Sequence, residues 1–263
     1  MKKLFLAASL MFVLAPPFML AQNGFDGTWK LDLSNAQFPK KPDVFLLQNG
    51  TWECKTCVPP VKVKADGTDQ TVTGHPYYDT AAIKVVNDHQ IEETDKKNGK
   101  TVTTLKMTVS PDGNTLTFEF TDSSNSNAEP VTGKSEETRV ANGPAGSNAV
   151  SGSWRISKVD TVSDNGTTWT YKVNGNELTM TTPTGQSYTA KLDGTNAPYK
   201  GDPGTDGVSV KMMGKNTLVE TDKRGDKVIG VSKMTLASDG KTAKIVFEDK
   251  LHGTTSEATA IKQ

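Results

Sequence analysis

Hydrophobic and polar residues alternate along much of this chain with a period of two. Residues 105–109 read Leu-Lys-Met-Thr-Val, and residues 116–121 read Leu-Thr-Phe-Glu-Phe-Thr. Successive side chains of a strand point to opposite faces of a sheet, so this pattern predicts half-buried β-strands. No stretch keeps a helical period, which argues against a parallel α/β sheet. The expected fold class is therefore all-β.

Short turn sequences separate these alternating stretches. Residues 112–113 and 239–240 are both Asp-Gly, and residues 49–50 and 174–175 are both Asn-Gly. Glycine accepts the positive φ that tight hairpin turns require, so these pairs predict hairpins between neighbouring strands. Counting the stretches between turns predicts a meander of seven to eight strands in each half of the chain.

The second half of the chain repeats the first. Glu-Thr-Asp-Lys at residues 93–96 recurs at residues 220–223, and Gly-Thr-Trp-Lys at residues 27–30 matches Gly-Ser-Trp-Arg at residues 152–155. A nearly constant offset through several such landmarks predicts a tandem duplication. The Gly-, Asn- and Pro-containing segment between the copies has the composition of a linker. The expected domains are a first β-barrel over 22–140, a linker over 141–150 and a second β-barrel over 151–263.

Residues 1–21 have the order of a secretory signal peptide. Lys2 and Lys3 precede an apolar run from Leu4 to Ala15, and Ala21 supplies a small residue for cleavage. The apolar run is shorter than the roughly 20 residues that a membrane-spanning helix needs. We therefore expect an exported protein, periplasmic or extracellular, with no membrane insertion after signal cleavage.

Charge and composition narrow the classes of partner. The chain has 30 Lys and Arg against 30 Asp and Glu, and loss of Lys2 and Lys3 would leave a net charge of −2. This balance gives no electrostatic basis for binding nucleic acid. Hydrophobic residues make up 34% of the chain and aromatic residues 7%, which suits two modest cores better than one large core.

The first strand of each copy carries a Gly-x-Trp motif, with Trp29 in the first and Trp154 in the second. Arg139 lies on the last strand of the first copy. In these features the chain resembles the lipocalin or calycin group of up-and-down barrels. The resemblance implies that Trp29 and Trp154 close the barrel ends, with Arg139 packed across a tryptophan. The alignment places Ala260 opposite Arg139 in the second copy, leaving Lys262 as a poor substitute.

The resemblance also implies a carrier that holds a small apolar ligand inside its barrel, although barrels of this size can instead be filled by side chains. The alternative function is a structural or protein-interaction envelope protein with filled, ligand-free barrels, whose protein partner is unknown. The third alternative is an enzyme, but the sequence offers no identifiable set of nucleophile, base and orienting group. We identify no catalytic residues, no metal site and no cofactor, and we expect the three histidines to lie on the surface.

Cys54 and Cys57 lie three residues apart between two strand patterns. Such a pair can form a disulfide across a turn, and an exported protein meets oxidising conditions. A redox motif would require a following helix, haem attachment a histidine after the second cysteine, and zinc a second ligand pair. We therefore expect a structural disulfide. The second copy lacks both cysteines, so the disulfide is not required for the fold.

Glu93 and Glu220 occupy equivalent positions in the two copies and are candidate ligand-binding residues. By alternation Glu93 shares a strand face with Ile91, and Glu220 shares one with Leu218. A buried carboxyl group must find a partner or take up a proton, and either state could orient a ligand. The alternative is that both strands run into a solvated hairpin, with the glutamates at its wet rim.

Overall fold

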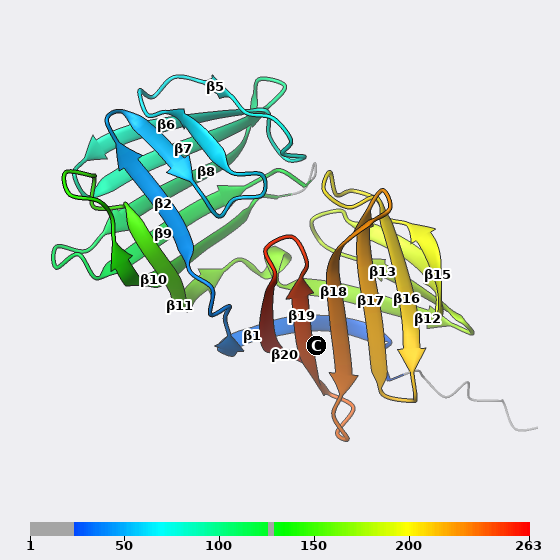
Figure 1. The fold of residues 1–263 in the computed structure, drawn as a ribbon. Coiled ribbons are helices and arrows are strands. Elements are labelled where there is room, and N and C mark those ends of the chain that lie inside the picture. The colour runs from blue at the N-terminus through cyan, green and yellow to red at the C-terminus, as the bar shows by residue number, and fades with distance from the viewer. Residues whose placement is uncertain (1–23, 126–128) are drawn as a thin grey trace, which may run out of the picture.

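Two ten-stranded antiparallel sheets make up the chain, as the computed structural model of residues 24–125 and 129–263 shows. Each sheet curls into a nearly closed barrel, and the two barrels lie side by side (Figure 1). The all-β, barrel-like expectation is thus confirmed. The predicted signal peptide, residues 1–21, lies outside the described residues.

The first sheet is blue to green in Figure 1 and has the strand order β4-β3-β2-β11-β10-β9-β8-β7-β6-β5. Its strands are β2 (Asp43–Gln48), β3 (Thr51–Cys54), β4 (Val61–Lys64), β5 (Gln70–Thr71), β6 (Thr80–Asn87), β7 (Gln90–Lys97), β8 (Lys100–Val109), β9 (Thr115–Asp122), β10 (Val131–Asn142) and β11 (Gly152–Val162).

The second sheet has the order β14-β13-β12-β1-β20-β19-β18-β17-β16-β15. Backbone hydrogen bonds between Ser187 and Lys200 help to join its two edges. Its strands are β1 (Gly27–Gln37), β12 (Thr168–Asn174), β13 (Glu177–Thr181), β14 (Ser187–Lys191), β15 (Asp193–Pro198), β16 (Gly207–Met213), β17 (Thr217–Arg224), β18 (Lys227–Leu236), β19 (Thr242–Asp249) and β20 (Thr254–Lys262).

The prediction of seven to eight strands per barrel was wrong, because each sheet has ten. The additional strands are short and lie in turn-rich sequence. β5 contains only two residues, and β15 begins with Asp193-Gly194, which has the sequence of a turn. The predicted Asp-Gly hairpins do form: Gly113 and Gly240 have φ angles of 77° and 65°.

The two barrels exchange their first strands, so they do not follow the predicted division into 22–140 and 151–263. β1 pairs with β12 and β20 of the second sheet, whereas β11 pairs with β2 and β10 of the first. In Figure 1 the dark blue β1 accordingly lies beside the red β20. The two strands occupy the same place in the two sheets, so the strand orders still match.

The connection between β10 and β11 accounts for the exchange. These strands form one long antiparallel hairpin, which brings β11 to the place that β1 would otherwise fill. The predicted linker is not a loose spacer, since Val150 is fully buried and the Ser151 hydroxyl accepts a hydrogen bond from Leu47 N at 2.8 Å. Short hinge connections favour strand exchange of this kind. β1 leaves for the second sheet through residues 38–42, where two prolines favour an extended chain.

Each barrel has its own hydrophobic core, and the exchanged segments carry large core residues. Trp154 and Val150 belong to the first core, while Trp29 and Phe25 belong to the second, and all four are fully buried. Removing either exchanged strand would therefore take a tryptophan out of a core as well as open a sheet.

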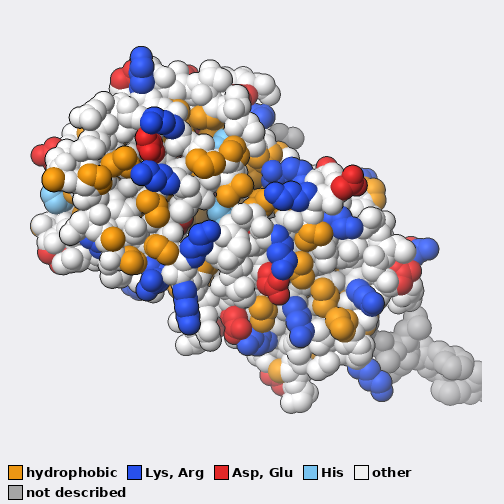
Figure 2. Space-filling model, in the orientation of Figure 1, with side chains coloured by type: hydrophobic (Ala, Val, Ile, Leu, Met, Phe, Trp, Pro, Cys, Tyr) orange, Lys and Arg blue, Asp and Glu red, His pale blue; other side chains and the backbone are white. Residues whose placement is uncertain are grey.

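On the face shown in Figure 2, apolar side chains lie among lysines, arginines and acidic residues. The single-turn 3₁₀-helix η1 (Asp164–Gly166) precedes β12. None of the helices in the described ranges is long or apolar enough to cross a membrane.

Candidate functional site

The two tryptophans of the Gly-x-Trp motifs lie at matching positions in the barrels. Trp154 Nε1 donates a hydrogen bond to Val150 O at 2.9 Å, and Trp29 Nε1 donates one to Phe25 O at 2.8 Å. The Arg139 guanidinium carbon lies 3.8 Å from the Trp154 ring centroid. The same guanidinium donates to the carbonyl oxygens of residues 113, 149 and 151. Arg139 therefore ties the last strand of the first half to the first strand of the second half.

Lys262, rather than Ala260, occupies the position of Arg139 in the second barrel, which corrects the alignment made from sequence. Trp29 pairs with Lys262 as Trp154 pairs with Arg139. Lys262 Nζ lies 5.3 Å from the Trp29 ring centroid and donates to Gly24 O at 3.0 Å. Both barrels thus place a cationic side chain over the buried tryptophan.

A cavity of about 300 Å³ opens into the first barrel, and we call it the first cavity. Hydrophobic side chains make up much of its wall, and the rings of Phe45 and Trp52 stack with centroids 5.4 Å apart. Its acidic lining comes from β2, β7 and β10. The apolar lining residues used below are Phe45, Trp52, Leu105, Met107 and Phe118, and the acidic ones are Asp43, Glu93, Asp95 and Glu137.

A second cavity, of about 290 Å³, lies in the second barrel. Strand pairing places Glu220, Met234 and Ile245 of its wall at the positions of Glu93, Met107 and Phe118. Leu31 of the exchanged strand β1 also lines it, so the first half of the sequence contributes to the cavity of the second. The wall is completed by Trp169, Tyr171, Met180, Thr182, Ser232 and Phe247.

Glu93 and Glu220 therefore lie on equivalent cavity walls inside the barrels, not at solvated hairpin rims. Each shares its strand face with a second acid two residues later, Asp95 on β7 and Asp222 on β17. Within each pair one acid raises the pKa of the other, since the charge of Asp95 acts on Glu93 and that of Glu220 acts on Asp222.

Burial sets the protonation of these groups. Desolvation, reinforced by the neighbouring acid, raises the pKa of Glu93 to about 8, and desolvation raises the pKa of Asp95 to about 7. Desolvation next to Asp43 raises the pKa of Glu137 to about 8. In the second barrel burial raises the pKa of Glu220, which accepts hydrogen bonds from Tyr188 and, at 3.4 Å, from Tyr171.

Several buried polar atoms beside the cavities have no hydrogen-bond partner among the described residues. In the first barrel these include Asp95 Oδ1 and Glu137 Oε2, and both side chains line the first cavity. In the second they include Asp222 Oδ1 and Trp169 Nε1. A buried polar atom without a partner costs about 1–3 kcal/mol. The native chain tolerates this cost at matching places in both barrels.

Comparison of the chain with known protein families and with curated proteins finds no match. The function is therefore argued from the cavities and the side chains that line them. Within the described ranges, no three His, Cys, Asp or Glu side chains gather in a way that could hold a metal ion.

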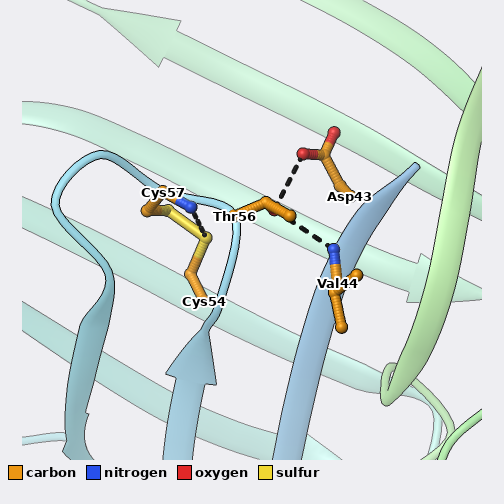
Figure 3. The surroundings of a disulfide bond; sticks show 5 residues. All are labelled: Asp43, Val44, Cys54, Thr56 and Cys57. Atoms are coloured by element: carbon orange, nitrogen blue, oxygen red, sulfur yellow. Dashed lines mark hydrogen bonds between the residues drawn. A yellow bond between two sulfur atoms is a disulfide. The ribbon is translucent and has the colours of Figure 1, made fainter. Parts of the chain in front are cut away.

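Cys54 and Cys57 form the predicted disulfide, and it lies at the first cavity (Figure 3). Thr56, between them, accepts a hydrogen bond from Val44 N at 3.1 Å and donates one to Asp43 Oδ1 at 3.0 Å. The disulfide loop is thus fastened to the start of β2. In the second barrel the corresponding turn is held instead by hydrogen bonds among Thr182, Thr184 and Gln186.

Each of the three histidines is half-buried. His75 stacks on Tyr78 with ring centroids 4.6 Å apart. His252 belongs to the β19–β20 turn of the second barrel, yet it lines the first cavity, and its Nδ1 lies 2.6 Å from Asp249 Oδ2. Lys41 Nζ donates to His252 O at 2.8 Å. One barrel therefore supplies part of the other's cavity wall.

Sequence reasoning missed Asp95, Asp222 and Glu137 as cavity-side acids. The alternating pattern does place Asp95 and Asp222 on the cavity face, because each lies two residues after its glutamate. The sequence around them resembles the approach to a turn, but β7 and β17 continue to Lys97 and Arg224. The repeat does not point to Glu137, because the equivalent residue of the second barrel is Ala260 and not an acid.

Proposed function

We propose that this chain is an exported binding protein that holds a small, largely apolar molecule in each of its two barrels. The observation that carries the proposal is the pair of cavities, about 300 and 290 Å³, on equivalent walls of the two barrels. Ligand sites are typically concave, mostly apolar and equipped with a few polar groups, and their volumes begin near 300 Å³. At the roughly 30 Å³ that each water occupies, either cavity has room for a ligand equal to about ten waters.

Lipocalin-like ancestry supports a carrier role. In each barrel a Gly-x-Trp tryptophan from one strand lies under a cationic side chain from the neighbouring strand. This is similar to the end-closing arrangement of lipocalins. We infer that a lipocalin-like gene was duplicated in tandem and that the copies then exchanged first strands. Export rests on the signal-like residues 1–21.

Native mass spectrometry and titration with an apolar fluorescent probe test this function. Protein purified from its own host should retain one or two small molecules, and delipidated protein should bind two probe molecules per chain. Leu105 and Ser232 occupy equivalent positions opposite Glu93 and Glu220. Leu105→Trp should therefore fill the first cavity and Ser232→Trp the second, each leaving one probe site.

The control for these variants is the unfolding transition, which should remain cooperative in both. Native protein without any retained mass, together with no probe binding by the delipidated chain, would overturn the proposal. That outcome would favour the structural or protein-interaction role with ligand-free barrels.

A further inference from the structure

The two cavities differ in their acidic groups. Glu137 of the first barrel is replaced by Ala260 in the second, and Asp43 is replaced by Trp169. Asp222, the counterpart of Asp95, does not line the second cavity, so the first cavity is lined by four carboxyl groups and the second by one, that of Glu220. The difference arises at particular positions of an otherwise matching wall.

Two carboxyl groups of the first cavity are nearly sealed from solvent and incompletely paired. Asp95 is 8% exposed and Glu137 is 6% exposed. Asp95 Oδ1 and Glu137 Oε2 have no hydrogen-bond partner, and none of the ion pairs found among the described residues includes Glu93, Asp95 or Glu137. Buried acids without a basic partner are unusual, because burying a charge is unfavourable unless it is paired. Both side chains line an opening large enough to admit that partner.

The rest of the first cavity suits the apolar part of a ligand. Phe45 lies between Trp52, at a centroid distance of 5.4 Å, and Phe118, at 6.1 Å. Leu105 and Met107 add flexible apolar surface from β8. Aromatic faces also attract cations, so this wall favours a cationic group as well as an apolar body.

In the second cavity the acid is already engaged. Glu220 accepts hydrogen bonds from the hydroxyl groups of Tyr188 and Tyr171. Among the described residues, the buried polar group on this wall that has no partner is the Trp169 N–H, a donor. The second cavity therefore lacks the set of free acceptors that the first one has.

We propose that the first cavity is a site for a small organic cation, a protonated amine carried on an apolar or aromatic body, whose ammonium group pairs with the carboxyl groups that line the cavity. The inference deepens the proposed function, since it presupposes that the cavities hold ligands. The second cavity takes a neutral molecule. The chain thus binds two different chemical classes with two barrels of one architecture.

Binding of an amine is linked to proton release. The raised pKa values of Glu93, Asp95 and Glu137 mean that the empty site holds protons near pH 7, and an ammonium group favours the ionised carboxylates. Amine affinity should therefore increase from pH 6 to pH 8.5. The titratable and charged groups facing these acids from other elements are Asp43 on β2, Tyr78 before β6, Asp122 on β9 and His252 at the β19–β20 turn.

The experiment is calorimetric titration of the full chain with 2-phenylethylamine and with 2-phenylethanol, a pair that differs in the amine. We expect one amine site per chain, at least tenfold tighter than the alcohol at that site. The binding heat should differ between phosphate and Tris buffers because protons are released. Asp95→Asn and Glu137→Gln together should weaken amine binding tenfold or more. Asp222→Asn, the matched change in the second barrel, should leave it unchanged.

Equal affinity for amine and alcohol, amine binding that survives both substitutions together, or buffer-independent heat would overturn the inference. The last comparison uses the unaltered chain, so it holds even if a variant fails to fold. Failure here is distinguishable from failure of the proposed function. Two apolar-probe sites without amine preference would overturn only the amine site, whereas absence of any binding would overturn both.

Discussion

Trp154 lies beneath the guanidinium group of Arg139, with 3.8 Å between the ring centroid and Cζ, although the two residues come from different halves of the sequence. The contact closes the first barrel with a strand of the second half. Trp29 under Lys262 closes the second barrel in the reciprocal way. Each barrel's stability therefore depends on a residue that is encoded with the other.

Trp154→Ala should destabilise the first barrel rather than the second. Loss of a fully buried tryptophan costs about 3–5 kcal/mol. Hydrogen exchange measured by mass spectrometry should show faster exchange in β2 to β10 and little change in β12 to β19. Trp29→Ala is the matched control and should show the reverse. Faster exchange in the sequence half that contains the mutation would contradict the strand exchange.

Lys262→Arg should stabilise the second barrel. A guanidinium group stacks on an aromatic face better than an ammonium group, so the gain should be about 0.5–1 kcal/mol in urea unfolding. The reciprocal change, Arg139→Lys, should cost about 2–3 kcal/mol, because Arg139 also donates to three backbone carbonyl groups. A loss for Arg139→Lys no larger than the gain for Lys262→Arg would contradict the contribution of these three hydrogen bonds.

Stability should decrease as pH rises from about 4.5 to about 8. The pKa of Glu137 is raised from 4.5 to about 8 by burial, so across this window the folded chain keeps a proton that the unfolded chain has lost. The slope for one such proton is at most about 1.4 kcal/mol per pH unit. Glu137→Gln should flatten the dependence of the unfolding free energy on pH. The neighbouring change Glu136→Gln is the control and should preserve the slope of the unaltered chain.

Removing the disulfide should weaken the first barrel modestly. Cys54 and Cys57 are three residues apart, and closing so short a loop stabilises the folded state by about 2 kcal/mol in the chain-entropy treatment. The double change Cys54→Ala, Cys57→Ala should lower the first barrel's unfolding free energy by about that amount. Treatment with a reductant should give the same loss in the unaltered chain. A comparable loss in the second barrel would show that the two barrels unfold as one unit.

Local sequence pattern was sufficient for the all-β class, the longer strands, the hairpin turns and the disulfide, because each depends on neighbouring residues. Alternation also placed Glu93 on the strand face of Ile91, but it left open whether that position is interior or at a solvated rim. Strand exchange did not follow, since β1 and β11 are nearly identical in pattern and either one fits either sheet. The choice depends on the geometry of the β10–β11 connection, which composition describes only as a linker.

Local sequence pattern could not predict the acidic lining of the first cavity, for a different reason. Asp95 and Glu137 lie on strands that are not neighbours in the sheet, and only barrel curvature brings both to one wall. His252 reaches that wall from the other barrel. Both relationships depend on closure and on the placement of one barrel beside the other, which residue alternation does not encode.

The pairing of β1 with β20 also sets the order in which this protein can be completed during synthesis. Residue 29 is made 233 residues before its neighbour, residue 262. The first barrel has all its strands once residue 162 has emerged, whereas β1 can pair with β12 only after residue 174 and with β20 only after residue 262. Such distant contacts slow folding and leave a strand exposed to wrong partners. A chaperone that shields β1 would therefore benefit the second barrel most.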